Sequence, residues 1–128
     1  MILVDSSVMI EALRKPDPKL QNLFTTLQPA LCGIVVAEVL HGARDAVHYT
    51  KLVQALASFP LVSMPDGIWE NVGRNLWSLR SSGVTVPFQD TAIATVAIEN
   101  YAELWTRDAQ FQLIHAVLPK LNLFQEPP

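Results

Sequence analysis

Four acidic side chains, each set in or beside an apolar stretch, offer the clearest chemistry in this chain of 128 residues. They are Asp5, Glu38, Asp90 and Asp108. Clustered carboxylates repel one another, so one of them would take up a proton unless a divalent cation supplied the opposite charge. Mg²⁺ suits such a cluster because it takes oxygen ligands, keeps several waters and binds through a few carboxylates together with substrate phosphate. The residue types therefore predict a magnesium site, provided that the fold brings the four acids together.

A zinc site finds no support in the same sequence. Cys32 is the only cysteine, and there is no HExxH segment, so the usual thiolate and two-histidine ligand sets of zinc are absent. The apolar neighbours of Cys32 predict a buried thiol instead. The three histidines are scattered; His41 alone shares a helix face with Glu38, three residues away, and could border the acidic site.

Short apolar segments alternate with helical patterns along the chain. Strands are expected at 2–5, 30–33, 59–64, 102–106 and 121–124. Helices are expected at 7–14, 18–27, 34–42, 46–58, 67–83, 89–101 and 108–116, with Pro16 and Pro18 breaking the chain after the first. This alternation is typical of an α/β fold whose mostly parallel sheet is covered by helices on both faces.

The expected elements bring the four acids to one edge of that sheet. Asp5 ends the first strand, and Asp108 follows the fourth strand by two residues. Glu38 lies one turn into the helix that leaves the second strand. The helix that Asp90 begins runs antiparallel to the strands, so its start lies at the same edge. Ligands of parallel α/β sheets bind at the carboxyl ends of the strands.

Each acid also has an ordinary structural interpretation. Asp5, Asp90 and Asp108 stand where they could cap or begin the helices that follow. Glu38 lies in a helix that is apolar nearly all round, so its carboxylate is expected to be partly buried and to need a partner. An ion pair with Arg44, or a turn toward solvent, would satisfy it. Chance placement can explain any one of these acids, but it is a poor explanation for four acids at the same edge of the sheet.

Around these acids the sequence resembles the PIN-domain family, and within it the VapC-type toxins of bacterial toxin–antitoxin pairs. The resemblance rests on LVDSSVMIEAL, VVAEVLHGAR, FQDTAIATVAIEN and LWTRDAQF, whose order and spacing match nearly end to end. It implies one PIN-like domain over residues 1–128, a three-layer α/β/α sandwich with a mostly parallel sheet of about five strands. The segment VTVPFQ before Asp90 departs from the usual small polar lead-in, which affects the loop at the substrate entrance.

The resemblance also implies the activity and the roles of individual residues. It implies a metal-dependent endoribonuclease that hydrolyses RNA phosphodiester bonds with metal-activated water. Glu38 either binds metal or acts as general base, and Ser6 and Thr106 are supporting hydroxyls. The expected ligands of one or two Mg²⁺ or Mn²⁺ ions are Asp5, Asp90 and Asp108. A homodimer and a small neutralising antitoxin are implied as well, in a heterotetramer or larger assembly.

Other families with an acid after the first strand fit less well. A phosphate-handling enzyme of the haloacid-dehalogenase type needs a second Asp where this chain has Ser7. A receiver domain needs an Asp at the end of the third strand, whereas Asp66 comes later, in a turn. The serious alternative is a catalytically inactive PIN-like module that binds protein or RNA, and the four intact acids count against it.

Composition and charge restrict the partners. The net charge is −3 and the nine Lys and Arg are scattered, so RNA must be bound locally rather than through a broad basic surface. The candidate cations are Arg14, Lys15, Arg44 and Arg107. Apolar residues weighed for either the core or a partner surface are Leu20, Leu23, Phe24, Trp69 and Trp77. No apolar run is long enough to span a bilayer and no basic region precedes the first one, so a cytoplasmic protein without membrane attachment is expected.

Overall fold

The computed structural model describes residues 1–15 and 17–128, so the chain break predicted at Pro16 lies outside the described residues. The described residues form three strands and seven helices that alternate in an α/β order. The strands are β1 (Ile2–Val4), β2 (Glu103–Trp105) and β3 (Asn122–Leu123). The helices are α1 (Ser6–Arg14), α2 (Pro18–Leu27), α3 (Gly33–His41), α4 (Ala46–Leu56), α5 (Ile68–Ser81), α6 (Phe88–Glu99) and α7 (Gln110–Val117). Every predicted helix is present, within a few residues of its expected bounds.

The three strands form one parallel sheet in the order β1, β2, β3. The register pairs Val4 with Trp105 at the carboxyl end of the first two strands. The Asp5 amide continues this ladder by donating to the Trp105 carbonyl at 2.9 Å. Asp5 and Thr106 are therefore the next residues along two adjacent strands, and their side chains emerge at the same edge.

The prediction of about five strands is confirmed only in part. Segments 30–33 and 59–64 are not strands in the described chain and make single parallel bridges, Leu3 with Ala30 and Leu31 with Leu61. Both segments still continue the sheet order beyond β1. Segment 30–33 lies beside β1, and segment 59–64 lies beside segment 30–33, where the Leu31 N–H donates to the Pro60 carbonyl at 2.9 Å. Pro29 and Pro60 have no amide N–H to donate, so the ladder between these two segments does not extend toward their N-terminal ends.

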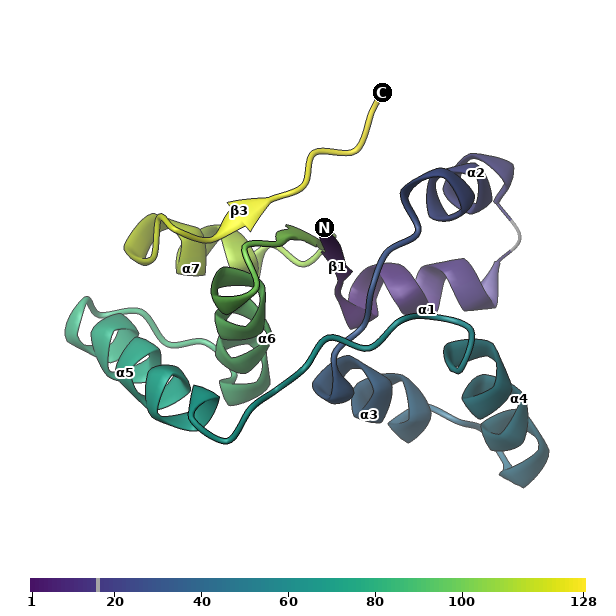
Figure 1. Cartoon of the computed structure of the whole chain (residues 1–128), viewed down its shortest axis with the longest axis horizontal. Helices are drawn as coiled ribbons and strands as arrows, with labels where there is room; N and C mark the ends of the chain where they lie inside the picture. Colours follow the sequence, from purple (N-terminus) through teal and green to yellow (C-terminus); the bar gives the residue numbers. More distant parts are fainter. Residues whose placement is uncertain (16) are drawn as a thin grey trace.

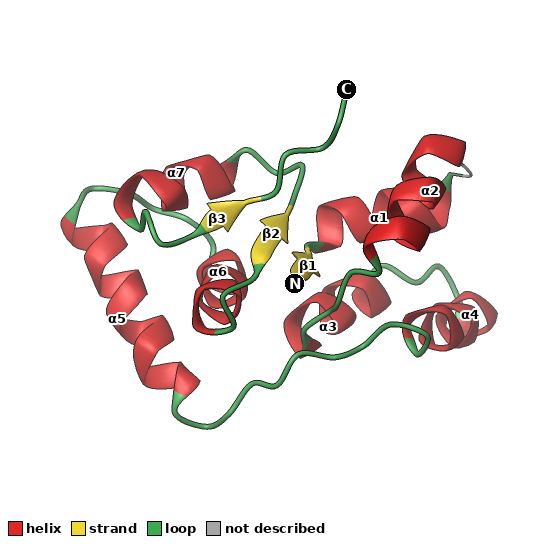
Figure 2. Cartoon of the chain, turned by 45° about the horizontal axis from the view of Figure 1, so that its top comes forward, coloured by secondary structure: helices red, strands yellow, loops and turns green. Residues whose placement is uncertain are grey.

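The helices lie on two sides of the sheet. In Figures 1 and 2, α5, α6 and α7 lie on one side of the strands, and α1 to α4 lie on the other. Helix α6 is buried from Asp90 to Ala97, because it packs against α5, α3, α7 and β2 at once. A helix enclosed on all sides needs apolar residues on all sides, which explains the sequence TAIATVAI.

The core is built on the fully buried strand residues Leu3, Val4, Leu104 and Trp105. The Trp105 ring packs against Phe24 and Phe124, at centroid distances of 5.0 and 5.4 Å. Of the apolar residues weighed for a partner surface, Leu20 is buried and Leu23 and Phe24 pack against the core, whereas Trp69 and Trp77 are 47% and 61% exposed. Across the described residues, each helix is too short or too polar to cross a membrane.

Candidate active site

The side chain of Asp5 is held by two hydroxyl groups. Ser7 Oγ and Thr106 Oγ1 each donate to Asp5 Oδ2, both at 2.8 Å. The backbone N–H groups of Arg107 and Asp108 donate in turn to these hydroxyls, at 3.1 Å to Ser7 and 3.0 Å to Thr106. Both hydroxyls bind the same carboxylate oxygen, Oδ2, which fixes the orientation of the carboxylate.

Asp5 stands at the N-cap position of α1 without acting as a cap. Its backbone is extended there, but its side chain makes no cap hydrogen bond. Elsewhere in the same chain Asp17 and Asp45 do cap helices, by accepting from the N–H groups of Lys19 at 3.1 Å and His48 at 2.7 Å. Asp5 is only 3% exposed. The ordinary cap interpretation therefore does not account for this buried carboxylate.

Asp90 is a buried carboxyl in the first turn of α6. Burial raises its pKa to about 6, and the negative charges of Asp108, Asp5 and Glu38 add to the rise. All three charges act on Asp90 because the fold brings these four acids, from distant parts of the sequence, to one place. A carboxyl surrounded by like charges is a group that takes up protons or cations readily.

Glu38 projects from α3 toward the same acids. Burial raises its pKa, the Ser6 hydroxyl offsets part of the rise, and the charges of Asp5 and Asp108 add to it. Its Oε1 is buried and has no hydrogen-bond partner in the part of the chain that the structure describes. The Glu38–Arg44 ion pair is not formed, since the Arg44 amide and guanidinium N–H groups point to His48 Nδ1 at 3.0 and 3.4 Å.

Asp108 combines a structural contact with its place beside the other acids. Its Oδ1 accepts from the Gln110 N–H at 3.0 Å, so the predicted helix-start role is present at this residue. Its charge nevertheless contributes to the raised pKa of both Asp90 and Glu38. One carboxylate can do both, because a carboxylate has two oxygens and about four acceptor sites.

The sequence predicts Ser6 and Thr106 as supporting hydroxyls of the site, and Ser7 only as a small polar residue of the turn beside the metal. The structure places Thr106 against Asp5 and Ser6 near Glu38, and it adds Ser7 as the second donor to Asp5. The signal for Ser7 was its position two residues after an acid, where a hydroxyl can reach back to the carboxylate. His41 is exposed at the end of α3.

Residues 2–116 match the family model of the PIN domain. The chain belongs to the PIN-domain family.

Several known proteins similar to this PIN domain are named VapC ribonucleases or VapBC complexes. Ribonuclease VapC32 of Mycobacterium tuberculosis is 34% identical over 116 residues, which cover 88% of each chain. A solved structure of VapBC2 from Rickettsia felis, bound to a promoter DNA fragment, has a TM-score of 0.85 at 20% identity, covering 99% of this chain and 100% of that one. A toxin–antitoxin complex from Klebsiella pneumoniae has a TM-score of 0.73 at 20% identity, covering 94% and 95%.

The donor set of this PIN domain fits a hard divalent cation. All four acids offer oxygen, and the buried Glu38 Oε1 lacks a hydrogen-bond partner among the described residues. Burial and the neighbouring negative charges raise the pKa values of Glu38 and Asp90. No three acidic, histidine or cysteine side chains of the described residues are close enough to form a ready-made ligand cluster. Mg²⁺ does not need one, since it keeps several waters and binds through one or two carboxylates.

Proposed function

We propose that this PIN domain is a metal-dependent endoribonuclease that hydrolyses RNA phosphodiester bonds as the toxin of a toxin–antitoxin pair. The observation that carries the proposal is the convergence of four acids whose mutual repulsion contributes to raising the pKa of Asp90 to about 6. Neither ion pair found among the described residues involves them. A cluster of this kind destabilises a fold unless a cation neutralises it. The VapC-type relatives support ribonuclease activity.

Asp5, Asp90 and Asp108 are the residues that would hold Mg²⁺ or Mn²⁺, Asp5 as the anchor and Asp90 and Asp108 directly or through water. Such an ion, when bound, supplies a water of lowered pKa and a positive charge opposite the charge that develops on the phosphate. Ser7 and Thr106 fix the orientation of Asp5 through its Oδ2. Second-sphere contacts of this kind commonly contribute about 10–100-fold to metal affinity or activity. Glu38 has a raised pKa, and its Oε1 has no hydrogen-bond partner among the described residues, so it is suited to accept a proton from the attacking water.

The nuclease proposal is tested with the purified chain, single-stranded and structured RNA, and Mg²⁺ or Mn²⁺. We expect cleavage that EDTA abolishes. Asp5→Asn should lower the cleavage rate at least about 100-fold, because the loss of a metal ligand should exceed the effect of second-sphere contacts, about 10–100-fold. Asp66→Asn is the matched control, since Asp66 is an exposed acid in a turn. If the pure protein cleaves no RNA and Asp5→Asn leaves growth inhibition unchanged, the chain is instead a PIN-like binding module without catalysis.

The chain is further proposed to form a homodimer that a small antitoxin neutralises, in a heterotetramer or larger assembly. The toxin–antitoxin complex among its structural neighbours supports this partner. A groove of about 430 Å³ between α1, α3 and α4 supports it as well, because Ile10 and Leu13 are exposed there beside Arg14 and Arg44. Light scattering of the chain alone and with the co-expressed neighbouring gene product tests the assembly. A strict monomer that ignores that product would contradict it.

A further inference from the structure

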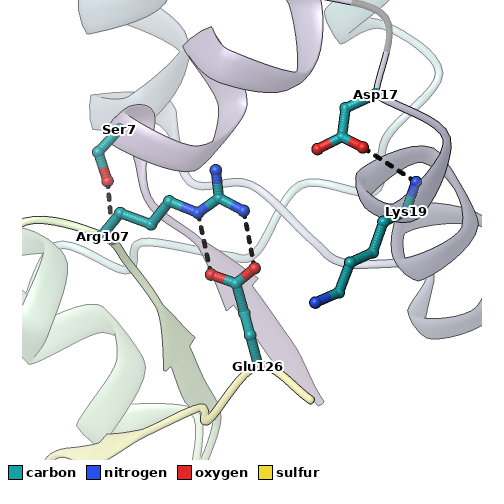
Figure 3. A network of polar contacts seen from close by, with 5 residues as sticks. All are labelled: Ser7, Asp17, Lys19, Arg107 and Glu126. Carbon is teal, nitrogen blue, oxygen red and sulfur yellow. Dashed lines mark hydrogen bonds and ion pairs between the residues drawn. The ribbon is translucent and has the colours of Figure 1, made fainter. Parts of the chain in front are cut away.

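A carboxylate near the C-terminus reaches the loop that supports the acidic site. Glu126 lies beyond β3, and its two oxygens accept from Arg107 Nε at 2.9 Å and Arg107 Nη2 at 2.7 Å, as Figure 3 shows. A two-point pair between guanidinium and carboxylate fixes orientation as well as distance. Arg107 itself lies between two residues of the site, Thr106 and Asp108.

The loop of residues 106–108 connects this ion pair to Asp5. The backbone N–H of Arg107 donates to Ser7 Oγ, and the next N–H, of Asp108, donates to Thr106 Oγ1. Both hydroxyls then donate to Asp5 Oδ2. A shift of the loop at Arg107 would therefore disturb both hydrogen bonds that orient Asp5.

The tail that carries Glu126 is itself fixed to the sheet. The Phe124 amide donates to the Leu104 carbonyl at 2.8 Å, and the Phe124 ring packs on Trp105. The side chains of Arg107 and Glu126 are 39% and 26% exposed, so solvent screens this pair only in part. Lys19 of α2 lies near Glu126 and adds a second favourable charge (Figure 3).

We propose that Glu126 is a positioning residue of the site, because it clamps Arg107 and thereby holds the loop that orients Asp5. The inference rests on the proposed nuclease function. The stretch that matches the family model ends at residue 116, so Arg107 lies within it and Glu126 lies beyond it. The competing outcome is that the tail withholds the Arg107 cation from RNA, in which case breaking the pair would raise activity.

The kinetic test compares Glu126→Gln with Glu70→Gln, which removes an exposed acid on α5. For Glu126→Gln we expect kcat to fall about tenfold while the KM for RNA stays unchanged, at the lower end of second-sphere effects. Arg107→Lys should behave alike, because it keeps the charge but loses the two-point geometry. An unchanged kcat, a raised kcat or a lowered KM would overturn the proposal.

A second measurement does not depend on catalysis. Amide hydrogen exchange reports local opening, and Glu126→Gln should speed exchange at the N–H groups of Arg107 and Asp108 at least about tenfold. The same variant should bind Mn²⁺ more weakly than the wild type. Exchange that is unchanged, or that rises equally across the sheet at residues such as Leu104, would overturn the clamp. If the wild type cleaves no RNA, the nuclease proposal fails, while the exchange data still test the clamp.

Discussion

Replacing Asp90 by Asn should stabilise the metal-free protein, although most substitutions of a buried polar residue destabilise. In the folded chain the pKa of Asp90 rises from its ordinary 3.8 to about 6. A rise of that size corresponds to about 3 kcal/mol of unfolding free energy at neutral pH. Relaxation and screening around the charge reduce the expected effect to about 1–2 kcal/mol. For a chain of this length, Asp90→Asn should raise Tm by about 3–8 °C in EDTA.

The pH dependence of this gain has a definite sign. The folded carboxyl holds its proton more tightly than the unfolded one, so ionised Asp90 destabilises the fold. The cost is complete above about pH 6, shrinks as the pH falls toward 3.8, and is absent below. The Tm advantage of Asp90→Asn over the wild type should therefore be smaller at about pH 5 than at neutral pH.

The assay is thermal unfolding in EDTA and in Mn²⁺, with Glu70→Gln as the matched control. Glu70 is also an acid in the first turn of a helix, but it is exposed. Its loss should cost about 0.3–1 kcal/mol through the helix dipole. Mn²⁺ should raise the Tm of the wild type more than that of Asp90→Asn, since a ligand stabilises the state that binds it. A lower Tm for Asp90→Asn in EDTA, as in the control, would refute the reasoning and make Asp90 a helix-start residue.

Two further predictions concern the hydroxyls and the sheet. Ser7→Ala should lower kcat at least about tenfold, and Ser6→Ala by less, because of these two serines it is Ser7 that donates to Asp5; equal losses in a kinetic assay would contradict this. Leu104→Ala should lower the unfolding free energy in urea by about 2–5 kcal/mol because the side chain is fully buried in β2. Leu113→Ala on α7 is the control, being 51% exposed, and a loss as large as that of Leu104→Ala would contradict the burial argument.

The sequence by itself determined the elements and their order. Apolar runs such as ILV and ELW, separated by patterns with helical period, were enough to predict β1, β2 and every helix. The position of each acid relative to these runs was enough to predict a common edge. The strand predictions failed at 30–33 and 59–64, where the apolar pattern is correct but the pairing is limited to single bridges, and Pro29 and Pro60 lack the N–H groups that would extend the pairing between the two segments. Apolar patterning reports burial, whereas a strand also needs N–H donors in register.

Only the tertiary structure decided how the acids are supported. The hydrogen bond between Asp5 and Thr106 forms because β1 and β2 pair in register, and no local pattern specifies it across about a hundred residues of sequence. The local sequence does not distinguish Ser7 from Ser6 as the hydroxyl that binds Asp5; the fold does. Glu126 pairs with Arg107 because the tail after β3 brings the two side chains together. Local patterns follow from the backbone period of each element. Contacts between elements depend on register and packing, which exist only once the chain has folded.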